Sequence, residues 1–349
     1  MKQKLGCWWH ERWRTELALA LPRIVRSSAW RWESLCNRSE KLDYDDSTKS
    51  YSCAWEDTSR LTVARIFPHV GGRLLKECVR NWPVRFSTEV SVELGDPEVT
   101  FVLGVRGLGR LPQFRTTLAS LMGQTDCSIE IIVVEQDWEQ RFQPEIPPGV
   151  GYIFTKISHP QMPFNRSWAL NVGTRAAKGR VVVLHDADMI VPQRLARGIA
   201  NYVREDVDGM RIPRFIFYLD RSNSARLTET RDIHSVDSVE TIVQNNRTPI
   251  ALTREALIRI GGHEEAFYGW GAEDNEFIDR ARTLNLKEGA MFPLIHLWHE
   301  TPPKKLGDRN RRDLEALMSV PSADRISALQ KRPFGEMKPA VAWKPVKGD

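Results

Sequence analysis

Long hydrophobic runs are missing from this sequence. No segment approaches the ~20 consecutive apolar residues that a transmembrane helix requires, so we expect no membrane-spanning helix. Basic residues do precede an apolar patch near the start, but Glu11, Arg14 and Glu16 interrupt that patch. Because a secretory signal needs a continuous apolar core, the sequence predicts a cytoplasmic protein.

Cysteine is also scarce. Five cysteines are spread over 349 residues, and none belongs to a CxxC pair. Their odd number and wide spacing do not fit a disulfide framework or a cysteine-based zinc site, so we expect reduced, mostly buried thiols. The length suits one large α/β domain with additions, or two domains.

A basic surface over the body of the chain is absent too. Residues 1–38 hold eight Lys/Arg and three Asp/Glu, which accounts for the whole net charge of +5. The remaining residues are electrically balanced, so we predict no nucleic-acid partner.

Tryptophan, by contrast, is plentiful at the N-terminus, where seven of the twelve lie within residues 1–97. An apolar stripe recurs there at helical spacing, formed by Trp9, Trp13, Leu17, Leu21 and Ile24. One interpretation is a helix lying on an anionic membrane surface through residues 1–38. The other is a helix packed on the main domain, which Pro22 and the nearby acids favour. Residues 39–60 are polar and predict a loop or linker.

From Val99 onward, apolar segments alternate with helical ones. The expected strands cover residues 99–105, 129–137, 151–157 and 180–188, and the expected helices cover 111–124 and 165–179. Strands that are apolar on both faces and alternate with helices predict a mostly parallel sheet covered on both sides. Ligands bind beyond the carboxyl ends of such strands, which is where a site is expected.

Two carboxylates, Asp186 and Asp188, follow the last of these strands. Residues at i and i+2 lie on the same side of an extended backbone, so the two charges repel unless a cation is near. Oxygen ligands of this kind suit Mg²⁺ or Mn²⁺, which also bind phosphate. A surface turn with two solvated acids is the alternative, and the position directly after a buried strand favours the metal site.

The segment FYGWGAEDNE places Trp270 between two glycines, with Glu273 and Asp274 at the start of a predicted helix. Acids in a first helical turn gain about 0.3–1 kcal/mol from the helix dipole, which explains them without any function. The dipole does not explain a tryptophan on a glycine turn, which suits stacking on a sugar ring. A carboxylate kept ionised there can accept a proton.

His296 and His299 follow an apolar segment at a spacing of three. Such a pair can ligate a metal, but no HExxH motif or cysteine pair accompanies it, and a structural role is the commoner one.

Together these segments resemble GT-A fold glycosyltransferases, in particular the β-1,4-galactosyltransferase and chondroitin-polymerase groups. The resemblance is carried by FNRSWALNVG (164–173), VVVLHDADMIVP (181–192), GGHEEAFYGWGAEDNEFIDRA (261–281) and HLWHETPP (296–303). It implies an α/β fold of the GT-A type, Rossmann-like, with a mostly parallel central sheet and helices on both faces. We therefore divide the chain into a Trp-rich, mainly helical extension (1–97), a GT-A domain (98–305) and a C-terminal tail (306–349).

The resemblance also implies a chemistry. A metal-dependent, inverting enzyme would move a hexose or N-acetylhexosamine from a UDP-sugar to a hydroxyl of a glycan or lipid-linked saccharide. Asp186, Asp188 and His299 would hold Mn²⁺ or Mg²⁺, with His299 preferred to His296 because a proline pair follows it. The residues implied to meet the nucleotide sugar are Arg106, Glu135, Asp137, Arg166 and Asp186.

On the acceptor side, the resemblance implies that Asp274 takes the proton of the attacking hydroxyl. Glu273 would hydrogen-bond sugar hydroxyls, and Trp270 would stack on a sugar of the bound substrate. The implied setting is surface-polysaccharide synthesis, in the cytoplasm or at the inner face of the membrane.

This sequence departs from the family pattern at three places. Ala272 stands where the family has a glycine, and residues 245–249 replace a glycine pair, which leaves the donor sugar open. Residues 220–247 predict a long polar loop that could close as a lid. Two alternatives remain, a sugar nucleotidyltransferase, suggested faintly by GVRGLGRL (104–111), and a non-catalytic carbohydrate-binding protein on the same fold.

Overall fold

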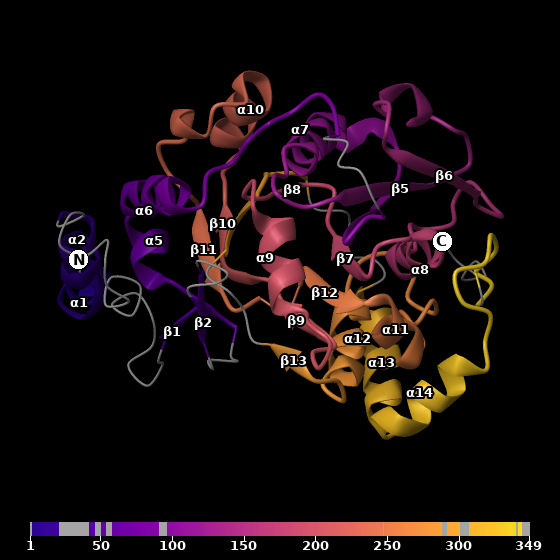
Figure 1. The fold of residues 1–349 in the computed structure, drawn as a ribbon. Coiled ribbons are helices and arrows are strands. Elements are labelled where there is room, and N and C mark those ends of the chain that lie inside the picture. The colour runs from indigo at the N-terminus through magenta and orange to yellow at the C-terminus, as the bar shows by residue number, and fades with distance from the viewer. Residues whose placement is uncertain are drawn as a thin grey trace.

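The central sheet of the protein has seven strands in the order β13-β9-β12-β7-β4-β5-β6 (Figure 1). Its parallel part consists of β4 (Val99–Val105), β5 (Ile129–Asp137), β6 (Gly151–Lys156) and β7 (Val181–His185). Each begins at, or one residue after, the predicted position. The antiparallel strand β12 (Ile250–Thr253) extends the sheet beyond β7, followed by β9 (Gly209–Arg211) and β13 (Leu286–Lys287).

Helices cover both faces of this sheet, as predicted for a GT-A fold. Alternate residues of β4 and β7 point to opposite sides and belong to two separate apolar clusters. One cluster includes residues of α7 (Leu111–Met122) and α9 (Leu195–Tyr202). The other includes residues of α8 (Arg166–Ala176), α11 (Arg254–Arg259) and α12 (Glu273–Ala281). At Gly173, a Cβ would lie 2.2 Å from Val102 Cγ1, so only glycine lets α8 approach β4 this closely.

A second sheet of five strands stands beside the first, in the order β3-β11-β10-β14-β8. Its strands are β3 (Ser59–Arg60), β11 (Thr241–Gln244), β10 (Pro213–Tyr218), β14 (Phe292–His296) and β8 (Met189–Ile190). The strand β8 directly follows the Asp186–Asp188 segment and pairs antiparallel with β14, Met189 opposite His296. This pairing carries the end of β14 to the carboxyl end of β7.

The structure described here is a computed structural model. It describes residues 2–20, 42–45, 50–53, 58–90, 96–246, 248–287, 292–300, 307–339 and 341–343. Leu21 and Ile24 of the predicted N-terminal stripe lie outside these residues.

The prediction of a long loop over residues 220–247 is wrong. The segment contains α10 (Arg221–Thr230) and β11. Asp220 caps α10 by accepting a hydrogen bond from the Asn223 amide, and Leu227, Val236 and Val239 are buried. Capping and a few buried apolar side chains order a segment that reads as polar overall. The predicted loop at 39–60 likewise contains a hairpin of β1 (Leu42–Asp45) and β2 (Ser50–Cys53), and β3.

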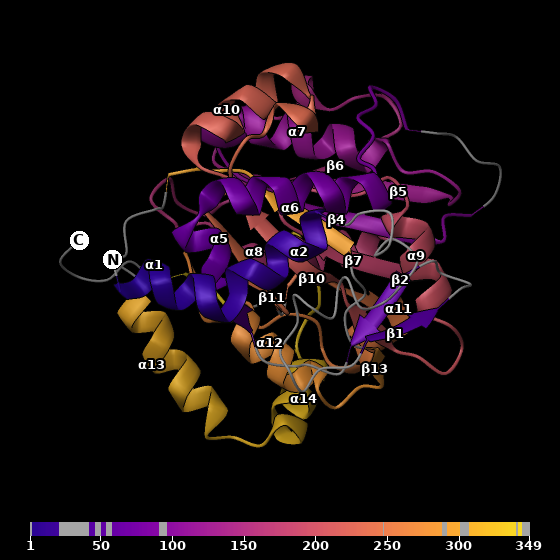
Figure 2. The ribbon, with the colours of Figure 1, turned by 90° about the vertical axis from the view of Figure 1, so that its left-hand side faces the viewer.

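The N-terminal helices pack on α5 (Thr62–Ile66) and α6 (Pro68–Asn81), as Figure 2 shows. They are α1 (Lys2–Cys7), a π-helical turn (Trp8–Arg12) and α2 (Trp13–Ala20). Their buried side is formed by Cys7, Thr15 and Leu19. The predicted stripe is on the opposite side, where Trp9 is 70% and Trp13 48% exposed. Among the described residues, no helix has the length and apolar content to cross a membrane.

The C-terminal residues do not trail away from the domain. Helices α13 (Gly307–Met318) and α14 (Ser322–Gln330) pack on α12, and the chain then runs back beside α8 (Figure 1). Trp168 Nε1 of α8 donates to the carbonyl oxygen of Glu336 at 2.8 Å, and Arg175 Nη1 donates to that of Phe334 at 3.0 Å. The division at residues 97 and 305 stays a prediction from the sequence.

A buried ionic network fixes α12. The fully buried Arg280 donates to both carboxylate oxygens of Glu276, at 2.8 and 2.7 Å, and to the carbonyl oxygen of Gly262 at 2.8 Å. Arg325 of α14 donates to Glu276 Oε1 at 2.7 Å. The buried Glu276 carboxylate therefore faces two guanidinium groups and, with the Asp279 partner of Arg325, ties α14 to α12.

We predict that Glu276→Gln destabilises the protein strongly. The change leaves two buried cations without their shared counter-charge, which typically costs about 3–5 kcal/mol of unfolding free energy. Urea unfolding measures this loss. The matched control is Glu315→Gln, which breaks the exposed Arg311–Glu315 pair and should cost less than about 0.5 kcal/mol. Equal, small losses in both variants would contradict the assigned role of the network.

Candidate active site

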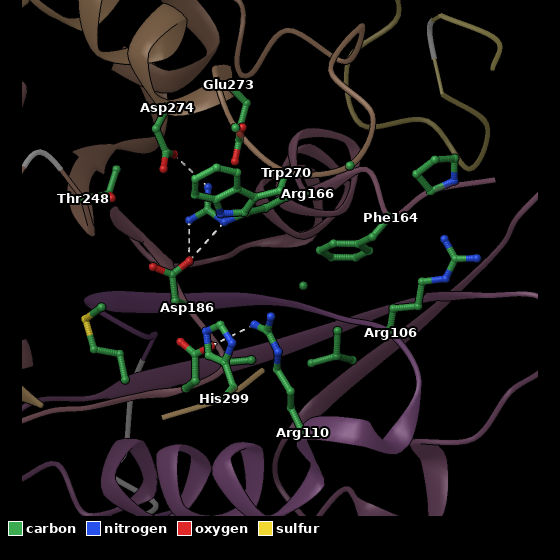
Figure 3. A pocket seen from close by; sticks show the side chains of 18 of the residues that line it. Arg106, Arg110, Phe164, Arg166, Asp186, Thr248, Trp270, Glu273, Asp274 and His299 are labelled. Atoms are coloured by element: carbon green, nitrogen blue, oxygen red, sulfur yellow. Dashed lines mark hydrogen bonds and ion pairs between the residues drawn. The ribbon is translucent and has the colours of Figure 1, made fainter. Parts of the chain in front are cut away.

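A cavity of about 1420 Å³ lies at the carboxyl ends of β4 and β7 (Figure 3). Eight of the ten predicted site residues line it, namely Arg106, Arg166, Asp186, Asp188, Trp270, Glu273, Asp274 and His299. They come from segments separated by more than 150 residues and meet where the parallel-sheet rule places a ligand.

Asp188, His296 and His299 form a cluster that could hold a metal ion, with their ligand atoms all within 4.8 Å of one another. His299 Nε2 is 3.3 Å from Asp188 Oδ2, and His296 Nε2 is 3.8 Å from Oδ1. The β8–β14 pairing produces this arrangement, and the Leu297 amide donates to the Asp188 carbonyl oxygen at 2.9 Å. His296, ranked below His299 from the sequence, therefore also belongs to the cluster, although it lies farther from Asp188 than His299 does. Asp186 is not part of this cluster.

The donor set fits a divalent transition metal. One carboxylate and two imidazoles suit Mn²⁺ better than Mg²⁺, which favours oxygen ligands. The His296 ring stacks on Tyr218 at a centroid distance of 4.4 Å, which fixes its orientation. Burial lowers the pKa of His296, so its imidazole is neutral at pH 7, as a metal ligand must be. Arg110 Nη1 lies 3.0 Å from Asp188 Oδ2 and supplies a positive charge at the same place.

Arg166 connects the two predicted halves of the site (Figure 3). Its Nε and Nη2 donate to Asp186 Oδ1, at 3.0 and 2.7 Å, and its Nη1 donates to Asp274 Oδ1 at 3.0 Å. The guanidinium thus spans from the segment after β7 to the first turn of α12. Asp186 is thus paired with Arg166 and is not one of the residues of the metal cluster.

The protonation equilibria of these groups reflect this pairing. Burial alone would lower the pKa of Arg166, but Asp186 and Asp274 outweigh burial and raise it. Burial alone would raise the pKa of Asp186, but Arg166 together with His185 and His296 outweighs burial, and the pKa is lowered. At Asp274 burial prevails over Arg166, and the pKa is raised above its ordinary value. A carboxylate with a raised pKa is a stronger base.

Glu273, the residue before Asp274, is a buried acid that lines the cavity. Burial, and then the neighbouring Asp274 charge, raise the pKa of Glu273 to about 7. Its Oε2 is buried and has no hydrogen-bond partner among the residues that the structure describes. A buried acceptor of this kind is costly unless a bound group donates to it, as a sugar hydroxyl would.

The turn that carries Trp270 is held in place. Gly269 and Gly271 have positive φ angles of 77° and 99°, and Ala272 has a φ of 80°. The side chain of Asn310, from α13, donates to the carbonyl oxygens of Tyr268, Trp270 and Gly271. Trp270 itself is 63% exposed, so its ring is available to a ligand. The turn is a fixed support rather than a loose hinge.

Two residues that were predicted to bind the nucleotide, Glu135 and Asp137, do not line the cavity. Glu135 is fully buried, and its carboxylate accepts hydrogen bonds from the amides of Arg141 and Phe142. Asp137 Oδ2 accepts from the Gly107 amide at 3.1 Å and so shapes the turn after β4. Arg106 does line the cavity.

Several residues that line the cavity were not singled out as site residues from the sequence. Four of them are Arg110, Asn246, Thr248 and Trp343. Thr248 hydrogen-bonds Asp274, and Asn246 lies in the stretch that replaces the family's glycine pair. That departure from the family pattern was the one available signal, because it marked the stretch as unusual.

Two family models match parts of this chain. Residues 109–264 match the family model described as glycosyl transferase family 2. Residues 249–309 match the model described as the N-terminal domain of galactosyltransferase. A search of curated proteins gives no match.

Two similar solved structures are of Drosophila β1,4-galactosyltransferase 7. One is its catalytic domain with xylobiose, at 16% identity and a TM-score of 0.36, covering 61% of this chain and 79% of that chain. The other is a mutant with manganese, UDP-Gal and xylobiose, at 16% identity and a TM-score of 0.35, with the same coverage.

We predict that His296→Ala weakens Mn²⁺ binding as strongly as His299→Ala does. Each variant loses one of three protein ligands, so we expect at least the ~10–100-fold loss typical of metal-site changes. Electron paramagnetic resonance of free Mn²⁺ measures the affinity. Asp186→Asn is the control and should have a clearly smaller effect, because Asp186 is paired with Arg166. A loss in Asp186→Asn that exceeds both histidine variants would rule out the three-residue cluster.

Proposed function

We propose that this chain, a glycosyltransferase by its family matches, moves a hexose or N-acetylhexosamine from a UDP-sugar to an acceptor hydroxyl, with inversion of the anomeric carbon. The acceptor is a glycan or a lipid-linked saccharide. The observation that carries this proposal is the position of Arg166, which joins the segment beside the metal-ligating cluster to the base candidate Asp274 within one cavity.

The donor side of the reaction uses Asp188, His296 and His299. When bound, Mn²⁺ would act as a Lewis acid that neutralises charge on the departing diphosphate. Arg110, whose side chain is 42% exposed beside Asp188, can swing to a phosphate oxygen. Arg166 keeps Asp186 ionised and in place near that diphosphate. The metal ion and Arg110 would favour departure of UDP by stabilising its negative charge.

The acceptor side uses Asp274 and Glu273. The acceptor oxygen forms a bond to the anomeric carbon as the bond from that carbon to the UDP oxygen breaks, and UDP leaves with the electron pair. Asp274 takes the proton of the acceptor hydroxyl. The unpartnered Glu273 Oε2 would accept a hydrogen bond from a sugar hydroxyl, and Trp270 would stack on a sugar ring. Attack from the face opposite UDP inverts the configuration.

We predict that Asp274→Asn keeps UDP binding but lowers transfer by about 10²–10⁴-fold, the usual loss when a general base is removed. A coupled assay of UDP release measures transfer, and calorimetry measures UDP affinity. Asp313→Asn is the matched control, because this carboxylate sits on α13 in an exposed pair with Arg309. Transfer by Asp274→Asn at the wild-type rate would remove Asp274 from the role of base.

The N-terminal helices support a further proposal, peripheral contact with a membrane. Leu5, Trp9, Trp13 and Leu17 form a stripe at a spacing of four, and these side chains are 62%, 70%, 48% and 37% exposed. Lys2 and Lys4 are also exposed, on α1 beside Leu5. Exposed indoles together with basic residues suit the interface of an anionic membrane. Such contact would bring the enzyme to lipid-linked acceptors, as expected for surface-polysaccharide synthesis at the inner face of the membrane.

We predict that replacing Trp9 and Trp13 together by serine reduces binding to vesicles of phosphatidylglycerol and phosphatidylcholine by at least about 10-fold. Sedimentation with the vesicles measures binding. The matched control replaces Met318 and Val320, two exposed apolar residues at the end of α13, by serine. Vesicle binding that is absent in wild type, or equal in both variants, would exclude this stripe as a membrane contact.

A further inference from the structure

Residues 341–343 reach the cavity from outside both family matches. The matched segments end at residue 309, yet Trp343 lines the cavity together with Arg106 and Phe164. Two residues earlier, the carbonyl oxygen of Val341 accepts a hydrogen bond from the Tyr268 hydroxyl. From the sequence, residues 306–349 were predicted to be a C-terminal tail, whereas in the structure Trp343 lines the cavity.

The segment that delivers Trp343 is anchored at several points. Arg332 pairs with the carboxylate of Glu264, at 2.9 and 2.8 Å. Gly335 has a φ of +60°, and a Cβ there would lie 2.4 Å from the carbonyl oxygen of Asn171, so the chain presses closely on α8. The contacts of Phe334 and Glu336 with α8 add to these. Trp343 therefore stands on a fixed support.

Trp343 lies at the Arg106 end of the cavity. Its ring is 5.6 Å from that of His159, centroid to centroid, with an angle of 35° between the planes. The same loop holds Arg106, which donates to the carbonyl oxygens of Met162 and Pro160. The metal-ligating cluster and Asp274 come from other segments, after β7, at the end of β14 and on α12. This end of the cavity is aromatic and basic.

We propose that Trp343 is a wall of the nucleotide-base site, on which the planar base of the donor stacks. This inference rests on the proposed function. A diphosphate held by Arg110 and by a metal ion at the Asp188 cluster would place the sugar to be transferred toward Asp274. The base would then lie toward the other end, where Arg106, Phe164 and Trp343 are. Every nucleotide base has a π-face, so the indole of Trp343 would contribute to nucleotide affinity by stacking on the base. The C-terminal segment is thus part of the donor site.

The test is calorimetric titration in the presence of Mn²⁺, with two ligands that differ in the base. UDP carries a nucleotide base, and inorganic pyrophosphate has none. Trp343→Leu keeps an apolar side chain for packing but loses the π-face, and Trp343→Phe keeps a smaller one. We expect Trp343→Leu to weaken UDP binding on the order of 10- to 100-fold, as for one lost base stack, and Trp343→Phe to weaken it by less than about 10-fold. Pyrophosphate binding should stay at the wild-type value in both.

Met337→Ala, which truncates a side chain 54% exposed on the same segment, is the control and should bind both ligands as wild type does. Unchanged UDP affinity in Trp343→Leu overturns the inference but leaves the proposed function standing, and so does an effect on acceptor KM alone. An equal loss of UDP and pyrophosphate affinity also overturns it, because it shows general damage to the site. Wild-type protein that binds pyrophosphate but not UDP overturns the proposed function itself.

Discussion

The site depends on one guanidinium group held between two carboxylates. Arg166 donates to Asp186 and to Asp274, and the positive charge that they share favours the ionised form of both carboxylates. The residues before Arg166 are fixed as firmly. The Asn165 side chain caps α8 and also donates to the Glu265 carbonyl oxygen at 2.7 Å, and the Phe164 carbonyl oxygen accepts from the Gly269 amide at 2.8 Å. The segment 164–166 thus holds together the strand end, the tryptophan turn and helix α12.

The two sheets divide the chemistry between them. The central sheet presents Asp186 and Asp188 after β7, and the second sheet presents His296 at the end of β14. Their join is the short strand β8, two residues long, whose register sets Met189 opposite His296. A shift of one residue would turn the His296 side chain to the other face of the sheet and separate it from Asp188. The geometry of this candidate metal cluster is therefore a consequence of strand register.

Much of the fold could be predicted because its cause is local. The strands β4, β5 and β7 are apolar on both faces, and α12 has its apolar residues at helical spacing after a run of acids. The helix α10 was missed because its order comes from the Asp220 cap and a few buried side chains, not from overall composition. His296 and Trp343 reach the site through contacts with residues more than 70 positions away, which no local pattern records. Glu135 lies near the end of β5 as predicted, but backbone amides in the following turn donate hydrogen bonds to its carboxylate.

The most direct measurement is calorimetric titration of UDP into the wild-type protein, first with Mn²⁺ and then with EDTA. A cavity that combines the Asp188, His296 and His299 cluster with a nucleotide site predicts tight binding with Mn²⁺ and a large loss of affinity with EDTA. UDP binding that EDTA does not change, or no UDP binding in either condition, would contradict a metal-dependent UDP-sugar transferase.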